Sequence, residues 1–197
     1  MAIARSKLVD ASVARWYHCV SRCVRKAFLL GEGEGNRKKW LENRLEELGQ
    51  IFAVALGGFS LMDNHLHVLL RLDPAVARTW SDDEVVRRWG RLFPPRDKSR
   101  QPIPLPEQWI QERLDDAPWI AKTRDRLQSL SWFMKCLKEP LSRLANRQDK
   151  TRGAFKVRCK AFRWGPTSIW SNIRADSFAG EKPRSRKSWS GSSSGWV

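Results

Sequence analysis

The clearest strand pattern in this chain is in residues 51–72, which read IFAVALGGFSLMDNHLHVLLRL. Apolar and β-branched residues dominate it, as they do in strands that pack against a core. Turn-forming residues interrupt it twice, at Gly57–Gly58 and at Asp63–Asn64. The pattern therefore predicts two strands, with a turn at Asp63–Asn64 and a break around the paired glycines.

The second of these strands carries two of the chain's three histidines, one residue apart. Successive side chains of a strand point to opposite faces, so His65 and His67 project from the same side. The alternate residues Leu66, Val68 and Leu70 then face a core. Two imidazoles so placed can hold one divalent cation when a third ligand comes from elsewhere. The competing interpretation is a pair of half-buried, hydrogen-bonded strand histidines.

Two further elements precede this stretch. Residues 15–23, RWYHCVSRC, mix aromatic and β-branched residues and predict a first strand. Residues 36–48, NRKKWLENRLEEL, place their leucines along one helical face, with charges elsewhere. Gly49 stands where a helix commonly ends, so the helix is predicted to close there.

Helical patterns dominate the chain after residue 73. Residues 81–84, SDDE, have the form of a capping box and predict a helix start. Residues 93–106, FPPRDKSRQPIPLP, are a proline-rich linker that cannot be helical throughout. A long helix is expected from about Asp125, and Pro140 should bend or split it.

The composition indicates a basic protein of ordinary domain size. The 197 residues include 37 Lys and Arg against 21 Asp and Glu, a formal net charge of +16. Such an excess attracts polyanions, most commonly nucleic acid and next a membrane surface. The chain has no apolar run long enough to span a membrane and no secretory signal at its start, so a cytoplasmic location is expected. The four cysteines form no CxxC pair and are expected to be reduced thiols.

The character of the sequence changes after Phe155. Residues 156–197 contain nine Lys and Arg against two acidic residues, with four tryptophans that follow no periodicity. We therefore predict three parts: an N-terminal arm at 1–14, one domain at 15–155, and a disordered basic tail at 156–197.

The ordered run of features from 15 to 155 resembles the HUH single-tyrosine transposases, especially the REP-associated, insertion-sequence type of bacteria. The signature of that family is His–hydrophobic–His on a central strand, commonly preceded by Met-x-Asn. Here it stands as Met62, Asp63, Asn64, His65, Leu66 and His67. YHCVSRC in the first strand and LSWFMKCLKEPLSRLANRQDKTRGAF, residues 130–155, add to the likeness.

The resemblance implies an α+β fold, an antiparallel sheet with helices packed on one face, ferredoxin-like or RRM-like. It implies that His65 and His67 hold Mg²⁺ or Mn²⁺ against a phosphodiester of single-stranded or hairpin DNA. It implies strand cleavage and rejoining through a covalent phosphotyrosine, the chemistry of DNA transposition. It is compatible with a homodimer. No membrane partner is expected, because the sequence has no apolar run of spanning length.

The chain departs from the family where the nucleophile should stand. Its single tyrosine, Tyr17, lies in the first predicted strand, and no tyrosine follows Phe155. The helix that supplies the nucleophile and a third metal ligand in the family is therefore missing, and a frameshift is our hypothesis for its loss. We expect Tyr17 to be a packing residue with its hydroxyl at the surface. No catalytic residue and no DNA contact is assigned from the sequence.

Three interpretations stay open at this stage. The first is a transposase-family protein impaired by the loss of its nucleophile. The second is a non-catalytic nucleic-acid-binding module, in which Arg and Lys contact phosphates and exposed Trp stacks on bases. The third is the product of a decayed reading frame.

Overall fold

The structure is a computed structural model that describes residues 9, 15–22, 30, 37–150 and 158–163. Four antiparallel strands form one sheet in the order β2-β3-β1-β4. The strands are β1 (Trp16–Arg22), β2 (Val54–Leu61), β3 (His65–Leu72) and β4 (Arg158–Arg163).

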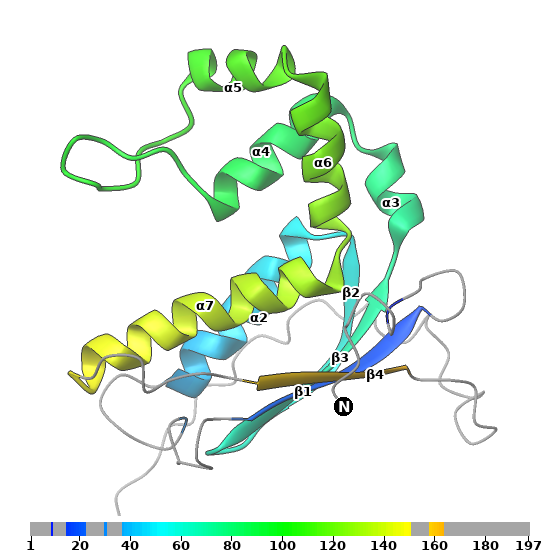
Figure 1. Cartoon of the computed structure of the whole chain (residues 1–197), viewed down its shortest axis with the longest axis vertical. Helices are drawn as coiled ribbons and strands as arrows, with labels where there is room; N and C mark the ends of the chain where they lie inside the picture. Colours follow the sequence, from blue (N-terminus) through cyan, green and yellow to red (C-terminus); the bar gives the residue numbers. More distant parts are fainter. Residues whose placement is uncertain (1–8, 10–14, 23–29, 31–36, 151–157, 164–197) are drawn as a thin grey trace, which may run out of the picture. The chain divides into compact units, whose positions relative to one another are not determined.

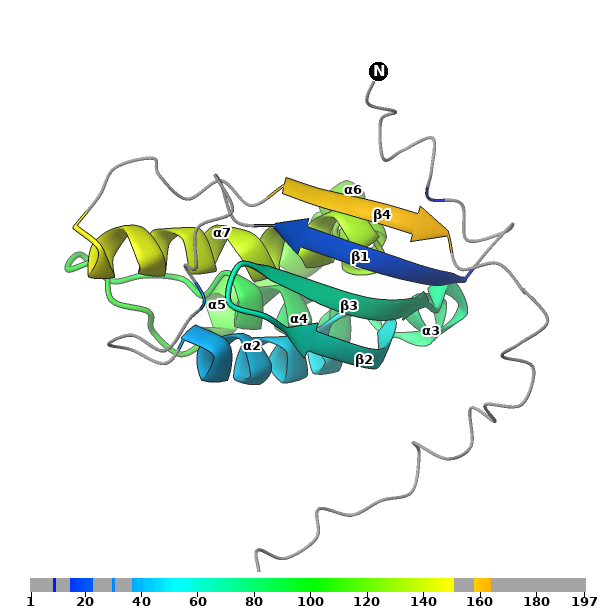
Figure 2. The same cartoon turned by 90° about the horizontal axis from the view of Figure 1, so that it is seen from below.

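Six helices accompany the sheet within the described residues. They are α2 (Arg37–Ile51), α3 (Pro74–Thr79), α4 (Asp82–Leu92), α5 (Glu107–Leu114), α6 (Ala117–Leu127) and α7 (Leu130–Gln148). In Figure 1, α2 and α7 lie along one face of the sheet, and Figure 2 shows the strands in front with the helices behind them. The predicted α+β class, with an antiparallel sheet and helices on one face, is confirmed.

The core lies between the sheet and these helices. The side chains of β3 alternate regularly between half-buried and buried positions. Leu66, Val68 and Leu70 are at most 1% exposed, as the alternation predicted. From β1, Tyr17 and Cys19 enter the same core. The helices contribute their apolar stripes, including Leu41, Leu45 and Leu48 of α2 and Phe133, Leu137 and Leu141 of α7.

The predicted break at Gly57–Gly58 is wrong. β2 runs through both glycines, and its pairing with β3 shifts register between Leu56 and Gly58. Such a β-bulge keeps the strand in the sheet while it absorbs one extra residue. The two glycines therefore mark an irregularity within one strand and not the end of a strand.

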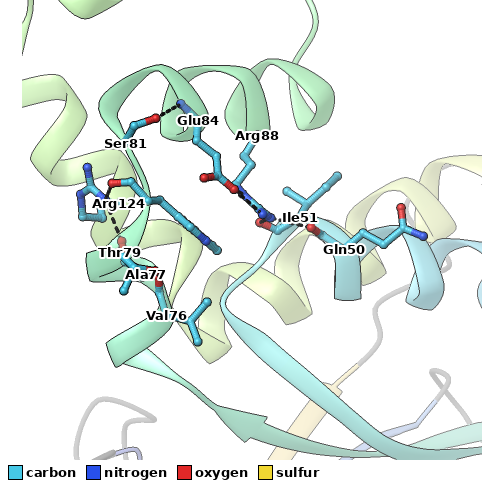
Figure 3. A network of polar contacts seen from close by, with 10 residues as sticks. Gln50, Ile51, Val76, Ala77, Thr79, Ser81, Glu84, Arg88 and Arg124 are labelled. Carbon is cyan, nitrogen blue, oxygen red and sulfur yellow. Dashed lines mark hydrogen bonds and ion pairs between the residues drawn. The ribbon is translucent and has the colours of Figure 1, made fainter. Parts of the chain in front are cut away.

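The predicted helix end at Gly49 is also wrong, because α2 continues to Ile51. The last carbonyls of a helix lack intrahelical donors and need partners from elsewhere. Arg88 of α4 supplies them, with its guanidinium donating to the carbonyls of Gln50 at 2.5 Å and Ile51 at 3.0 Å. Figure 3 shows this contact, and it removes the need for a glycine cap.

Arg124 of α6 makes the equivalent contact at the end of α3, also visible in Figure 3. It donates to the carbonyls of Ala77 and Trp80, both at 2.7 Å, and pairs with Asp82 at 2.6 Å. Two of the chain's many arginines thus hold helices together through backbone carbonyls.

The long helix predicted from Asp125 begins at Leu130 and is preceded by a separate α6. Pro140 does not split it, because α7 is continuous to Gln148. Proline lacks an N–H, so the carbonyl of Cys136, four residues earlier, loses its helical donor. Arg44 of α2 donates to that carbonyl at 3.4 Å, which lets the helix continue.

The SDDE capping box is confirmed: the Ser81 hydroxyl accepts from the Glu84 N–H at 3.1 Å at the start of α4. Residues 93–106 contain no helix, and Arg96 and Pro102 form an isolated antiparallel bridge there. The helices α3, α5 and α6 were not predicted. None of the helices in the described part of the chain combines the length and apolar character needed to cross a lipid bilayer.

The prediction of a disordered tail from residue 156 is wrong for residues 158–163, because they form β4 and pair with β1. The strand reads RCKAFR and pairs with β1 over its whole length. The predicted arm at 1–14 lies outside the described residues apart from residue 9, and so does the tail beyond residue 163.

Candidate functional site

The face of the sheet that no described helix covers carries the candidate site. The register of β1 against β3 pairs Val20 with His67 and Arg22 with His65. The outward residues of these two strands are half-buried or exposed. None of these outward residues carries a carboxylate. They are Trp16, His18, Val20 and Arg22 from β1, and His65, His67, Leu69 and Arg71 from β3. We call this surface the outer face.

Three histidines meet on the outer face. His65 and His67 project from the same side of β3, as the spacing predicted, and their ring centroids are 5.0 Å apart. His18 comes from β1, diagonally opposite His67, with a centroid distance of 5.0 Å to that ring. The Nε2 atom of His18 lies 2.8 Å from Nδ1 of His67, a hydrogen-bond distance. His67 therefore stands at the centre of a three-histidine cluster.

His65 and His67 each make a side-chain hydrogen bond through the Nδ1 atom. Nδ1 of His65 lies 2.5 Å from the side-chain oxygen of Asn64 and donates to it. When Nδ1 of His67 carries its proton, it donates to His18 in the same way. Each imidazole then keeps Nε2 as its ligand atom, because a metal-binding histidine donates its other N–H to a neighbouring acceptor.

The electrostatics of the cluster favour the neutral form of His67. Burial lowers its pKa from the ordinary value of 6.5, and Coulombic interactions with His18, His65 and Arg22 lower it further, because a positive charge on His67 would lie close to these basic groups. A neutral imidazole is the form that binds a metal. The donor chemistry of His65 and His67 thus fits a divalent cation.

The cluster does not contain a complete set of protein ligands. Among the described residues, no group of three or more His, Cys, Asp or Glu side chains is arranged to hold a metal ion. A cation held by His65 and His67 would take its remaining ligands from water or from a bound phosphate, as cations in open sites do. No third ligand is assigned.

His18 was not predicted as part of the site. The YHC pattern places it between two core residues, so its outward direction was readable from the sequence. Its nearness to His67 was not readable, because that depends on how β1 pairs with β3.

Tyr17 and Cys136, whose side chains carry nucleophilic atoms, are both inaccessible. Tyr17 is 0% exposed, so it packs in the core as expected, but its hydroxyl does not reach the surface. Cys136 is also buried, and burial raises the pKa of its thiol to about 11. A protonated, buried thiol is a poor nucleophile. Neither Tyr17 nor Cys136 is therefore placed to attack a phosphodiester.

Comparison with models of known protein families and with curated protein sequences gave no match.

Proposed function

We propose that this protein is a transposase-family DNA-binding protein that holds Mg²⁺ or Mn²⁺ through His65 and His67. Its ligand is single-stranded or hairpin DNA, bound on the outer face, and its tyrosine-dependent strand cleavage and rejoining is lost. The observation that carries the proposal is the pair of outward imidazoles whose Nδ1 atoms are both engaged by neighbours.

The arrangement of the sheet adds support. The order β2-β3-β1-β4, with helices between β1 and β2 and between β3 and β4, is that of a ferredoxin-like fold. We propose that fold for the chain, with α3 to α6 inserted between β3 and α7. It presents the histidine cluster on the central strands and leaves the outer face available for an extended strand of DNA.

Each residue has a defined part in this proposal. His65 and His67 supply imidazole nitrogen, and His18 and Asn64 hold these rings in the orientation and tautomer that bind metal. A bound cation would supply positive charge against a DNA phosphate. The absence of carboxylates among the outward residues of β1 and β3 removes a source of repulsion toward that phosphate.

A non-catalytic binding module is favoured over an active nuclease by one observation. The single tyrosine of the sequence is buried, so the covalent step of the transposase reaction has no described nucleophile. With Mn²⁺ and a labelled single strand carrying a hairpin, we expect no covalent protein–DNA adduct on a denaturing gel. An adduct that disappears in Tyr17→Phe would overturn this part of the proposal.

The metal site is tested by titrating Mn²⁺ and following the loss of its free-ion signal by electron paramagnetic resonance. We expect binding by the wild-type chain and none by His65→Ala or His67→Ala. His18→Ala should weaken binding about 10- to 100-fold, the usual effect of removing a group that orients a ligand. Ser60→Ala is the matched control, since Ser60 pairs with His67 in the sheet and is exposed. Mn²⁺ binding that survives both β3 variants would overturn the assignment.

DNA binding is tested by fluorescence anisotropy with a hairpin, an unstructured single strand and a duplex of equal length. We expect the hairpin or single strand to bind more tightly than the duplex at every salt concentration. All three affinities should fall as salt rises, because the protein displaces counterions from phosphates. Equal affinity for all three would reduce the interaction to general attraction by a basic protein.

A further inference from the structure

Trp16 occupies an unusual place on the outer face. It begins β1, is half-buried, and does not belong to the cluster that packs the core. Its indole reaches across β3 to the bulge of β2. A Cβ added at Gly57 would lie 2.5 Å from Cζ3 of the indole and 3.1 Å from Cη2. The indole therefore occupies the space above Gly57 that a side chain would fill.

An arginine lies beside Trp16, held in place by a carboxylate that offsets part of its charge. The guanidinium carbon of Arg71 lies 5.7 Å from the centroid of the indole ring. Asp73 holds Arg71 in place, with Nε 3.0 Å from one carboxylate oxygen. Arg22 stands exposed at the other end of β1, directly opposite His65. Two arginines thus share the outer face with an aromatic ring and three imidazoles.

We infer that Trp16 is a stacking platform for one unpaired base of single-stranded DNA. Arg71 and Arg22 would contact phosphates near the two ends of β1. This inference rests on the proposed function, because it takes its ligand from there. Aromatic side chains bind unpaired bases of any sequence through their faces, and cations beside them track the backbone.

The positions along β1 set where the stacked base lies. Trp16 lies four residues along β1 from Val20, the partner of His67, so it stands roughly 13 Å along the strand from that histidine. The stacked base therefore belongs to a different nucleotide from the one whose phosphate lies at His65 and His67, farther along the DNA strand. Gly57 keeps the indole in one place before DNA arrives, which lowers the ordering cost of binding.

The test measures binding of labelled single strands by fluorescence anisotropy in EDTA, with an abasic site moved through the strand one position at a time. For the wild-type chain we expect one position where loss of the base weakens binding about 5- to 100-fold. Trp16→Ala should bind the intact strand more weakly by a similar factor and should no longer distinguish the abasic strand. Trp16→Ala that still distinguishes it would overturn the inference.

Two further variants keep the result clear. Phe93→Ala is the matched control, an aromatic residue 44% exposed at the end of α4 and outside the outer face, and it should behave as the wild type. Gly57→Ala retains Trp16 but forces its indole to move, so it should reduce the abasic effect in a chain that keeps every aromatic residue. Unchanged urea unfolding midpoints identify variants that fold normally. A Gly57→Ala chain that folds and keeps the full abasic effect would contradict the placement of the base.

The design separates this inference from the metal proposal. Because EDTA is present, the abasic effect should also appear in His65→Ala and His67→Ala. Mn²⁺ binding without an abasic effect would support the metal site and overturn the platform. An abasic effect without Mn²⁺ binding would support the platform and overturn the metal site. A wild-type chain that binds no single strand would overturn both the platform and the DNA part of the proposed function.

Discussion

Replacing Arg88 by alanine should destabilise the protein more than its position near the surface indicates. Arg88 donates to the carbonyls of Gln50 and Ile51 at the end of α2, and its guanidinium carbon lies 4.0 Å from the centroid of the Trp80 ring. It also pairs with Glu84 at 2.6 Å. A single side chain therefore joins α4 to the end of α2 and covers a tryptophan that is only 8% exposed.

The magnitude follows from these contacts. The part-buried Ile51 carbonyl left without a donor costs about 1–3 kcal/mol. Loss of the contact with the Trp80 face costs about 0.5–2 kcal/mol. The Gln50 carbonyl is exposed and regains water, and the ion pair with Glu84 is screened, so both add little. We expect a loss of about 2–4 kcal/mol in the free energy of unfolding.

Urea unfolding followed by circular dichroism measures the effect. Arg87 is the matched control, because it is the same residue type one position earlier and its pair with Asp83 is half-exposed on both sides. Arg87→Ala should be indistinguishable from the wild type. Arg88→Lys keeps the charge over Trp80 but cannot reach both carbonyls, so it should fall between the two. If Arg88→Ala unfolds at the same urea concentration as Arg87→Ala, the reasoning is refuted.

Three other results are expected. Arg44→Ala should lower the free energy of unfolding by about 1–3 kcal/mol in the wild-type chain. The loss should be clearly smaller in a Pro140→Ala background, because alanine restores a helical donor to the carbonyl of Cys136. Urea unfolding of the wild type, the two single variants and the double variant measures this, and additive costs would contradict it. The raised pKa of Cys136 means that the unfolded chain loses its thiol proton first as the pH rises. Stability should therefore fall between the ordinary thiol value of about 9 and about pH 11, and Cys136→Ala should remove that part of the slope in thermal unfolding. Nucleotides downstream of the Phe155 codon, read in the other two frames, should encode a helix with a tyrosine, and its absence from both frames would end the frameshift hypothesis.

Local patterns predicted the elements whose stability is local. The alternation in HLHVLLRL correctly placed His65 and His67 on one face and the leucines in the core, because a strand has a fixed period of two. The capping box at 81–84 was also predicted correctly, since its hydrogen bond joins residues three positions apart. The α+β class of the fold was expected from the resemblance over residues 15–155 and not from these local patterns alone.

Helix ends and interruptions were predicted less well, for a common reason. Gly49 and Pro140 are local signals for a helix to stop, and at both points an arginine from another helix supplied the missing hydrogen bond. The glycines of β2 were misjudged in the same way, because the bulge there is shaped by pairing with β3. Each error lies where a distant residue outweighs a local preference.

Which side chains leave the sheet follows from the order of residues along each strand, because a period of two sends His18, His65 and His67 outward whatever surrounds them. Their meeting depends on the fold, because the register between β1 and β3 sets His18 Nε2 2.8 Å from His67 Nδ1. The position of the Trp16 indole above Gly57 depends on the fold in the same way. Direction along a strand depends on residues next to one another, whereas contact between strands depends on hydrogen bonds between segments some 50 residues apart.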